Sequence, residues 1–254
     1  MKPGVNGKIL LVVDTDGRKD VKRRTFSFMF EHQVEGIIYS KWVHGSITPP
    51  DELGRMPSVL VNCYDECGRF PAVVPDEVQG GATATRLLLE AGHRRIAFVN
   101  DAAPSPASVG RLAGYKAALA RFDVDFDPSL VLSVTADQEG GYGAAAQVLA
   151  TGATGVFCHN DRTALGLYDA LRESGKRMPD DISVVGFDNQ EVISAHMHPA
   201  LTTVGLPQYD LGVMGVRTLL RRCGADNDES EIVSERFKPV HVQCPVNAIS
   251  RLSV

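Results

Sequence analysis

The 254-residue sequence predicts an α/β protein made of two subdomains, each a doubly wound parallel sheet. The first observation is a repeated order of helix, glycine, polar link and apolar strand, at Gly92, Gly152 and Gly175. Glycine just past a helix end takes the left-handed cap at little cost. The second is that strands such as IAFV and ISVVGF are continuously apolar, which is typical of sheets covered by helices on both faces. The third is the number of such elements, which exceeds what one small sheet holds, so we expect two sheets.

Each element is predicted from its own pattern. Ala164, Leu167, Tyr168 and Leu171, for example, recur at three- and four-residue steps and indicate a helix. Short strands are expected in the tail from Ser234 on. Strands are expected near 8–13, 35–40, 58–62, 95–99, 129–134, 155–159, 182–187 and 201–204, and helices near 19–32, 77–91, 109–121, 138–151, 162–174 and 208–222.

Composition excludes several classes of protein. Hydrophobic residues make up 44% of the chain, which is too many for a disordered protein. Apolar runs such as Ile9–Val13 are far shorter than the ~20 residues that span a bilayer. The chain has a net charge of −5 and therefore lacks the excess of basic residues that is typical of nucleic-acid-binding domains. Five scattered cysteines and the lack of a signal peptide lead us to expect a cytoplasmic protein with reduced thiols.

Catalytic motifs give little support for an enzyme. The sequence contains no G-x-S-x-G, H-E-x-x-H, C-x-x-C or P-loop pattern. Gly141, Gly143 and Ala146 fit a loose dinucleotide fingerprint, but TADQEG separates them from the preceding strand, so we expect these glycines inside the first turn of a helix. His196 and His198 are two residues apart and point to different sides. We therefore expect no metal site, no cofactor and no catalytic residues.

A ligand site is expected beyond the carboxyl ends of the parallel strands, where such sheets bind small molecules. The residues found there are amides, a carboxylate, an arginine and aromatic rings. This set suits a sugar, because amides, carboxylates and guanidinium bind hydroxyl pairs while rings pack against the apolar face. The candidates are Asn62, Asn160 and Asp188 at strand ends, Trp42 and Tyr64 close by, and Arg111 near the start of a helix.

Each candidate also has a structural explanation. Asn160 and Asp188 are residue types that cap helices or turns. Arg111 could be a surface residue whose stem is packed down, and Trp42 could be a structural aromatic residue. Taken as a group, the candidates favour a ligand site, because all of them fall at the same end of the predicted sheets.

Four segments resemble the effector-binding core of LacI/GalR-type bacterial transcription regulators, which is similar to periplasmic sugar-binding proteins. They are GGATATRLLLEAGHRRIAFVN, GRLAGYKAAL, GVFCHNDRTALGLYDALRESGKRMPDDISVVGFDN and PALTTVGLPQYDLGVMGVRTLL, in family order from about Lys8 to the end. The resemblance implies a periplasmic-binding-protein type I fold, with two subdomains joined by three crossovers and the effector between them. By position, Arg111, Asn160, Asp188 and Asn62 match effector contacts of the family.

The resemblance also implies where the chain divides. We expect residues 1–101 with 206–236 in the first subdomain, which lacks the family's first strand and helix. The second subdomain is then 102–205 with 237–254. The crossovers are expected near Asn100–Ala102, Val204–Leu206 and residues 233–240.

The function that follows is a cytoplasmic sensor. We expect a homodimer that binds a small sugar-like effector and controls operator DNA allosterically, through a helix-turn-helix headpiece absent from this sequence. One alternative is the sugar-binding component of a transporter, which would be exported and monomeric. Another is a nicotinamide-dependent enzyme built on the glycine-rich turn near Gly141.

Overall fold

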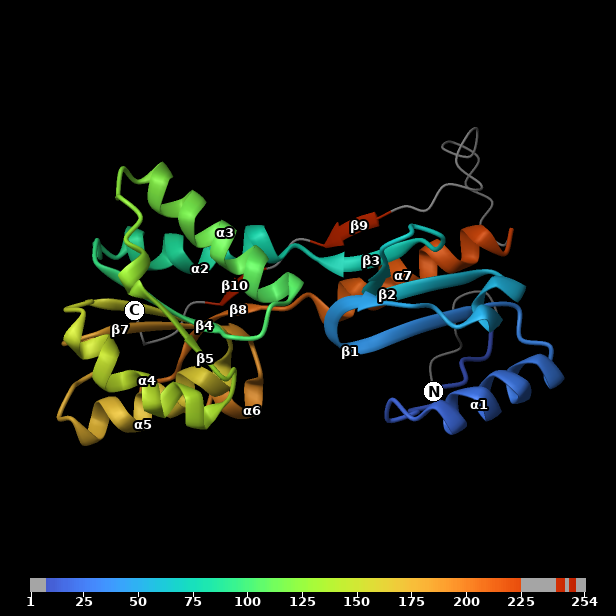
Figure 1. Ribbon diagram of the computed structural model, residues 1–254, viewed down its shortest axis with the longest axis horizontal. Coiled ribbons are helices and arrows are strands. Elements are labelled where there is room, and N and C mark those ends of the chain that lie inside the picture. The colour runs from blue at the N-terminus through green and yellow to red at the C-terminus, as the bar shows by residue number, and fades with distance from the viewer. Residues whose placement is uncertain (1–7, 225–240, 245–246, 250–254) are drawn as a thin grey trace.

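The strands form two separate sheets. The computed structural model describes residues 8–224, 241–244 and 247–249. One sheet has the order β1-β2-β3-β9 and the other has the order β10-β8-β7-β6-β4-β5. Figure 1 shows two bodies joined by a narrow middle, and we call the four-stranded body the first lobe and the six-stranded body the second lobe. The predicted α/β fold with parallel sheets is confirmed.

The second lobe is a doubly wound sheet. Its strands β4 to β8 are parallel in the order 2-1-3-4-5, and β10 adds an antiparallel edge. The strands are β4 (Ile96–Asp101), β5 (Val131–Val134), β6 (Gly155–Cys158), β7 (Ser183–Asp188), β8 (Thr202–Gly205) and β10 (Asn247–Ile249). The helices are α2 (Glu77–Glu90), α3 (Pro106–Arg121), the 3-10 turn η2 (Pro128–Leu130), α4 (Gln138–Ala150), α5 (Asp161–Glu173) and α6 (Glu191–Ser194).

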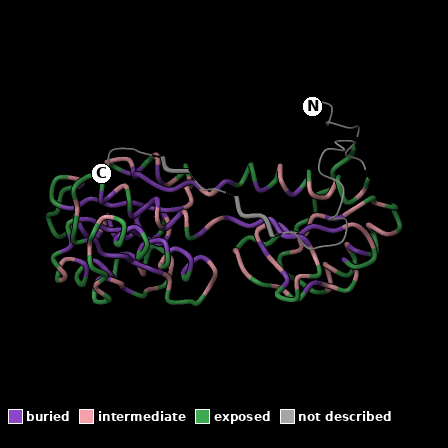
Figure 2. Tube along the Cα trace, turned by 90° about the horizontal axis from the view of Figure 1, so that it is seen from above, coloured by how far each residue is buried: buried purple, intermediate pink, exposed green. Residues whose placement is uncertain are grey.

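Both faces of this sheet are buried, because successive strand residues point to opposite sides. In β6, Val156 and Cys158 join the apolar cluster under α4 and α5, while Phe157 joins the cluster under α2 and α3. Phe157 also stacks on Phe98 of β4, with ring centroids 4.4 Å apart. Figure 2 shows the purple, buried trace running through the middle of this lobe.

The first lobe is smaller. Helix α7 packs on one face, where Leu211 meets Val59, Val61 and Val73. Helix α1 contributes its only buried residue, Phe26, to the other face. Its elements are α1 (Lys19–Glu31), β1 (Ile37–Ile47), the 3-10 turn η1 (Asp51–Arg55), β2 (Ser58–Asp65), β3 (Ala72–Pro75), α7 (Gln208–Arg222) and β9 (His241–Cys244).

One predicted strand does not form. The segment near 8–13 has no strand pairing among the described residues, and Ile9 to Val13 are between 44% and 90% exposed. The reason is that a strand needs a hydrogen-bonding neighbour, and no described strand lies beside this segment. The expectation from apolar composition was therefore wrong here.

The predicted division of the chain also needs correction. We expected residues 1–101 in the first subdomain, yet β4 pairs with β5 and β6, and α2 packs on α3. The chain thus leaves the first lobe at Pro75, after the short strand β3, and not near Asn100–Ala102. The chain returns to the first lobe between β8 and α7, close to the crossover expected at Val204–Leu206.

The expected third crossover, at 233–240, lies outside the described residues. Strand β9 pairs with β3, so residues 241–244 belong to the first lobe and not to the second as expected. The chain passes to the second lobe after Cys244, because β10 pairs with β8. Within the described ranges, no helix has the length and apolar character to cross a membrane.

Candidate functional site

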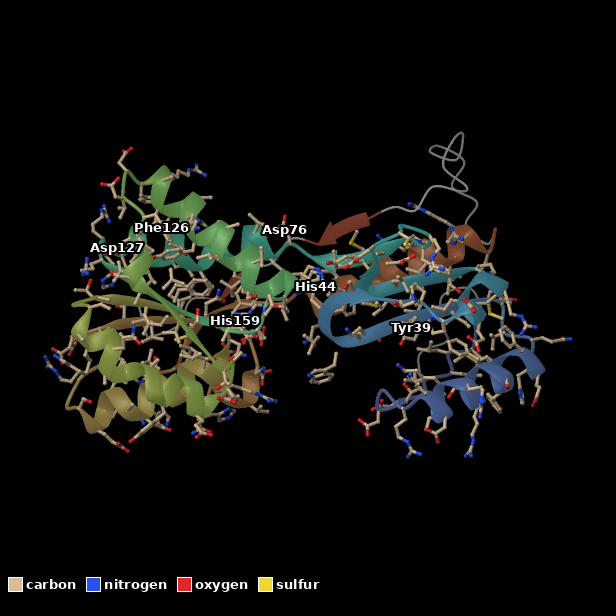
Figure 3. All side chains as sticks on the ribbon, viewed as in Figure 1. Tyr39, His44, Asp76, Phe126, Asp127 and His159 are labelled. Carbon is tan, nitrogen blue, oxygen red and sulfur yellow. The ribbon has the colours of Figure 1, made fainter. Side chains whose placement is uncertain are left out.

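A buried polar cluster lies where α2 and α3 of the second lobe meet β1 of the first. Its centre is Arg111 of α3, whose side chain is 4% exposed. Asp188, the last residue of β7, approaches it with a carboxylate oxygen 3.7 Å from Nη2. Figure 3 labels His44 and His159 in this region, on the facing ends of the two lobes. A residue predicted near the start of a helix and one predicted at a strand end are therefore side by side.

Arg111 is held from several directions. Its Nε donates to Oε2 of Glu77 at 2.9 Å, and its Nη1 donates to the carbonyl oxygen of His159. The guanidinium lies 3.6 Å from the centroid of the Phe187 ring, which gives a cation–π contact. These contacts fix the orientation of the guanidinium and leave further N–H groups for a ligand.

Glu77 connects the two lobes. It stands in the first turn of α2, directly after Asp76, whose side chain caps this helix by accepting from the Gln79 N–H. Its second oxygen accepts from Nδ1 of His44 in β1 at 3.1 Å. Burial opposes the ionisation of Glu77, but Arg111 and His44 together hold its pKa below the ordinary value.

Asp188 has an unusual backbone. Its φ of +99° lies in a region that residues with a side chain rarely adopt, and such strain costs of order 1–3 kcal/mol. Its carboxylate accepts from the amide of Gln190 at 3.3 Å. Burial raises the pKa of Asp188, although Arg111 acts in the opposite direction. Strained residues of this kind often occur at ligand sites.

His159, the residue directly after β6, supports the cluster. Its Nδ1 donates to Oδ1 of Asn100 at 3.0 Å, because an amide oxygen can only accept. Burial, helped by the nearby Arg111, lowers the pKa of His159 to about 3. The imidazole is therefore neutral at pH 7 and adds no charge to the cluster.

Two other predicted residues of the first lobe belong to a bulge in β1, Trp42 within it and Asn62 on the neighbouring strand β2. The pairing of β1 with β2 slips between Ser40 and Gly45. Asn62 has a φ of +56° and donates to the carbonyl oxygens of Lys41 and Trp42 at 3.0 and 3.1 Å. Its amide thus holds the bulge rather than reaching Arg111. The bulge exposes Trp42, which is 94% accessible to solvent.

Tyr64 and Asn160 have different surroundings. The Tyr64 ring lies edge-on to His44, with centroids 6.0 Å apart. The Asn160 side chain caps α5 by accepting from the Thr163 N–H, and its amide nitrogen donates to the Ala136 carbonyl. These bonds match the structural explanation considered for Asn160.

Sequence reasoning missed Glu77, His44 and His159. Glu77 lies two residues after the end of β3, so it obeys the same strand-end rule as the predicted residues, but β3 has only four residues and was not predicted. His159 directly follows β6, but the next residue, Asn160, was chosen as the candidate at this strand end. No sequence signal marked His44, because its position depends on the bulge.

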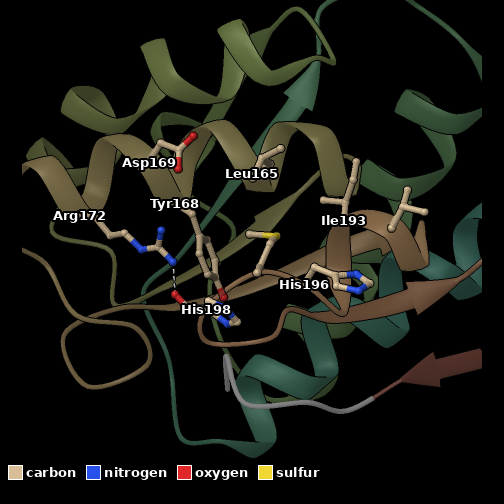
Figure 4. Close-up of a pocket in the computed structure, with 9 residues that line it drawn as sticks. Leu165, Tyr168, Asp169, Arg172, Ile193, His196 and His198 are labelled. Atoms are coloured by element: carbon tan, nitrogen blue, oxygen red, sulfur yellow. Dashed lines mark hydrogen bonds between the residues drawn. The ribbon is translucent and has the colours of Figure 1, made fainter.

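A separate pocket of about 220 Å³ lies on the second lobe, between α5 and α6 (Figure 4). There Arg172 donates to the carbonyl oxygen of His198. This pocket lies apart from the Arg111 cluster, and it includes none of the predicted residues. Its lining residues are Leu165, Tyr168, Asp169, Arg172, Val192, Ile193, His196, Met197 and His198.

The dinucleotide fingerprint does not form a cofactor turn. Gly141 and Gly143 lie inside α4, and a Cβ on Gly141 would sit 2.0 Å from the Thr163 carbonyl oxygen, so this glycine allows α4 to pack against α5. Among the residues that the structure describes, no group of three His, Cys, Asp or Glu side chains could hold a metal ion.

The fold and the polar cluster define a two-lobed α/β protein of the kind that binds small molecules between its lobes. Residues 85–242 match the family described as periplasmic binding protein-like domain. The HTH-type transcriptional repressor PurR of Vibrio atlanticus is 31% identical over 248 residues, covering 96% of this chain and 74% of that protein. The chain therefore belongs to the LacI family of transcriptional regulators, of which it spans the periplasmic-binding-protein-like core.

Solved structures agree with this assignment. A putative LacI-family regulator from Rhizobium etli superposes with a TM-score of 0.82 at 27% identity, covering 98% of this chain and 88% of that one. A LacI-family regulator from Enterococcus faecium, solved with bound ribose, gives a TM-score of 0.70 at 30% identity, covering 90% and 83%. Both structures are described as LacI-family transcriptional regulators.

Proposed function

We propose that this chain senses a small, sugar-like effector between its two lobes and transmits binding to an operator-binding headpiece in a homodimer. The observation that carries the site is the approach of the buried Arg111 guanidinium of α3 and the partly buried Asp188 carboxylate of β7, beside the contact between the lobes. The Enterococcus faecium regulator with bound ribose supports a sugar as the ligand class.

The chemistry of the cluster suits hydroxyl groups. A guanidinium with remaining N–H donors and a carboxylate with remaining acceptor capacity can bind adjacent hydroxyls of one ring. Because His44 of the first lobe bonds to Glu77 of the second, a ligand at Arg111 would also influence the contact between the lobes. A ligand that favours one arrangement of the lobes shifts their equilibrium by its difference in affinity for the two arrangements. We propose a cytoplasmic location, in keeping with control of operator DNA.

The test is a thermal-shift screen with neutral sugars and nucleosides, since a bound ligand raises the melting temperature by mass action. Calorimetry of the best compound should then show that Arg111→Ala and Asp188→Ala each weaken binding by about 1–3 kcal/mol. Asp188→Asn is a milder variant that keeps the shape of the side chain. A compound that binds all of these variants as well as the unchanged protein would place the effector elsewhere.

A further inference from the structure

We propose that Glu77 makes the site at Arg111 selective for uncharged or cationic effectors that carry hydroxyl or amino donors, and that it excludes phosphate and carboxylate ligands. This inference rests on the proposed function, because it names the chemical class that the same site accepts. Three features of the molecule support it: the charges around Arg111, the unpaired Nε2 of His44 and the bonds of Glu77.

The charge of Arg111 is already compensated. A buried guanidinium with free donors would be a receptor for phosphate or carboxylate. Here Glu77 accepts a hydrogen bond from Nε of Arg111 at 2.9 Å, and a carboxylate oxygen of Asp188 lies 3.7 Å from Nη2. Both Arg111 and Glu77 are about 5% exposed or less, so solvent screens their pairing weakly. A further anion would enter beside two carboxylates, and an uncompensated charge is costly to bury.

Other charged groups nearby do not reverse this balance. Asp161 is fully buried and accepts from the Thr203 hydroxyl at 2.6 Å and from the Gln190 N–H at 2.7 Å. The two other cations here, Arg162 and Lys41, are exposed, and Arg162 donates to the side chain of Gln190 at 3.4 Å. The buried part of the region therefore has more carboxylates than cations.

His44 supplies an acceptor to a ligand. Its side chain is 9% exposed, and among the described residues its buried Nε2 has no hydrogen-bond partner. With its proton on Nδ1 bonded to Glu77, the imidazole tautomer seen here offers Nε2 as an acceptor. A hydroxyl or an ammonium group can donate to that nitrogen, whereas the fully ionised phosphate of a sugar ester has no proton to donate. The same Glu77 thus pairs Arg111 and orients His44.

Inorganic phosphate is the direct probe. Melting temperatures are measured in phosphate and in chloride of equal ionic strength for the unchanged protein, Glu77→Gln and Glu90→Gln. Glu90 is the matched control, because it removes a carboxylate from the exposed end of the same helix, where it pairs with Arg86. We expect no phosphate-specific shift in the unchanged protein or in Glu90→Gln. Glu77→Gln should bind phosphate at least tenfold more tightly than the unchanged protein.

Two results would overturn the inference. One is phosphate binding to the unchanged protein that Arg111→Ala abolishes. The other is a folded Glu77→Gln variant, verified by circular dichroism, whose phosphate affinity is within twofold of the unchanged protein. If Glu77→Gln does not fold, the unchanged protein decides by itself, because phosphate binding through Arg111 contradicts the exclusion and its absence supports it.

Pairs of sugars separate this inference from the proposed function. The unchanged protein is titrated with ribose and ribose 5-phosphate, and with glucose, glucosamine and glucose 6-phosphate. We expect any binding to be at least tenfold weaker for the phosphate ester than for its neutral or amino counterpart. Preference for an ester overturns the selectivity while leaving the sensor function in place. Failure of every sugar and nucleoside to bind counts against the sensor function, while the phosphate experiment still decides the role of Glu77.

Discussion

Two apolar runs of similar composition, Ile9–Val13 and Ile96–Val99, have opposite surroundings. The second run forms β4, hydrogen-bonded to β5 and β6, and each of its side chains is at most 1% exposed. The first run has no strand partner among the described residues and is largely exposed. The comparison shows that apolar composition predicts a strand only where a neighbouring strand exists to receive it.

The same contrast extends to the two lobes. Helices cover both faces of the second-lobe sheet, and their close packing depends on glycines at which the backbones nearly touch. In the part of the first lobe that the structure describes, one helix packs on each face, and α1 buries only Phe26. We therefore expect the second lobe to be the more rigid part of the molecule, and it provides most of the Arg111 cluster.

Glycine substitutions should show the largest difference. A Cβ on Gly166 of α5 would sit 1.8 Å from the backbone oxygen of Gln138, so Gly166→Ala should cost about 2–4 kcal/mol of unfolding free energy. On Gly215 of α7 the nearest atom is a Val61 side-chain methyl at 2.6 Å, which can move, so Gly215→Ala should cost about 1–2 kcal/mol. Urea denaturation measures both.

Matched controls exist in each lobe. Gly143 of α4 and Gly212 of α7 have no atom within 4 Å of an added Cβ, so alanine there should stabilise the protein by about 0.5–1 kcal/mol through its helix propensity. Equal costs for Gly166→Ala and Gly215→Ala would show that the two lobes are packed equally tightly.

The next largest effect is expected in the dependence of the unfolding free energy on pH. The pKa of His159 is about 3 in the folded protein, below that of a free histidine near 6.5. Below pH 6.5 the unfolded chain takes up a proton that the folded chain does not, so stability falls as the pH falls. The loss between pH 6.5 and pH 5 should be about 1.5–2 kcal/mol.

Variants assign this effect to one residue. His159→Gln should remove most of the slope between pH 6.5 and pH 5, whereas His196→Gln, at an exposed position, should retain it. Burial also lowers the pKa of His93, which accounts for a small remaining slope. The pKa of Glu77 is lowered by Arg111 and His44, and the pKa of Asp188 is raised by burial. An unchanged slope in His159→Gln would contradict the neutral imidazole in the second lobe.

The smallest effect is expected at the β1 bulge. Trp42 is 94% exposed, so Trp42→Ala should change the unfolding free energy by less than about 0.5 kcal/mol. Asn62→Ala is the contrasting variant, because it removes two hydrogen bonds and places alanine at a φ of +56°, and it should cost about 1–2 kcal/mol. A large loss for Trp42→Ala would mean that the bulge is part of the first-lobe core.

The sequence predicted the second lobe well because its signals are local. The glycines after α2, α4 and α5, together with fully apolar strands, place β4, β6 and β7 within a residue or two. The first lobe depends on partners distant in the chain. Strand β3 has only four residues, follows Pro71 and ends at Pro75, so its sequence resembles a loop, and its omission moved the expected boundary from Pro75 to residue 101.

The candidate site divides in the same way. Asp188 was predicted because it lies at a clear strand end and Arg111 because it lies near the start of the helix after β4, and the structure brings them together. Glu77 was missed with β3, and His44 was missed because a shift of register in β1 cannot be read from residue types. Whether Arg111, Asp188 and the other predicted residues contact an effector stays a prediction.

The order of the elements along the chain has a consequence for biosynthesis. Residues from α2 to β8 form most of the second lobe as one continuous stretch, whereas α7 and β9 of the first lobe come afterwards. On a ribosome, which releases the chain from its N-terminus, the second lobe can fold while β1, β2 and β3 still wait for their covering helix and last strand. Nascent chains should therefore acquire protease resistance first in the segment between residues 76 and 205.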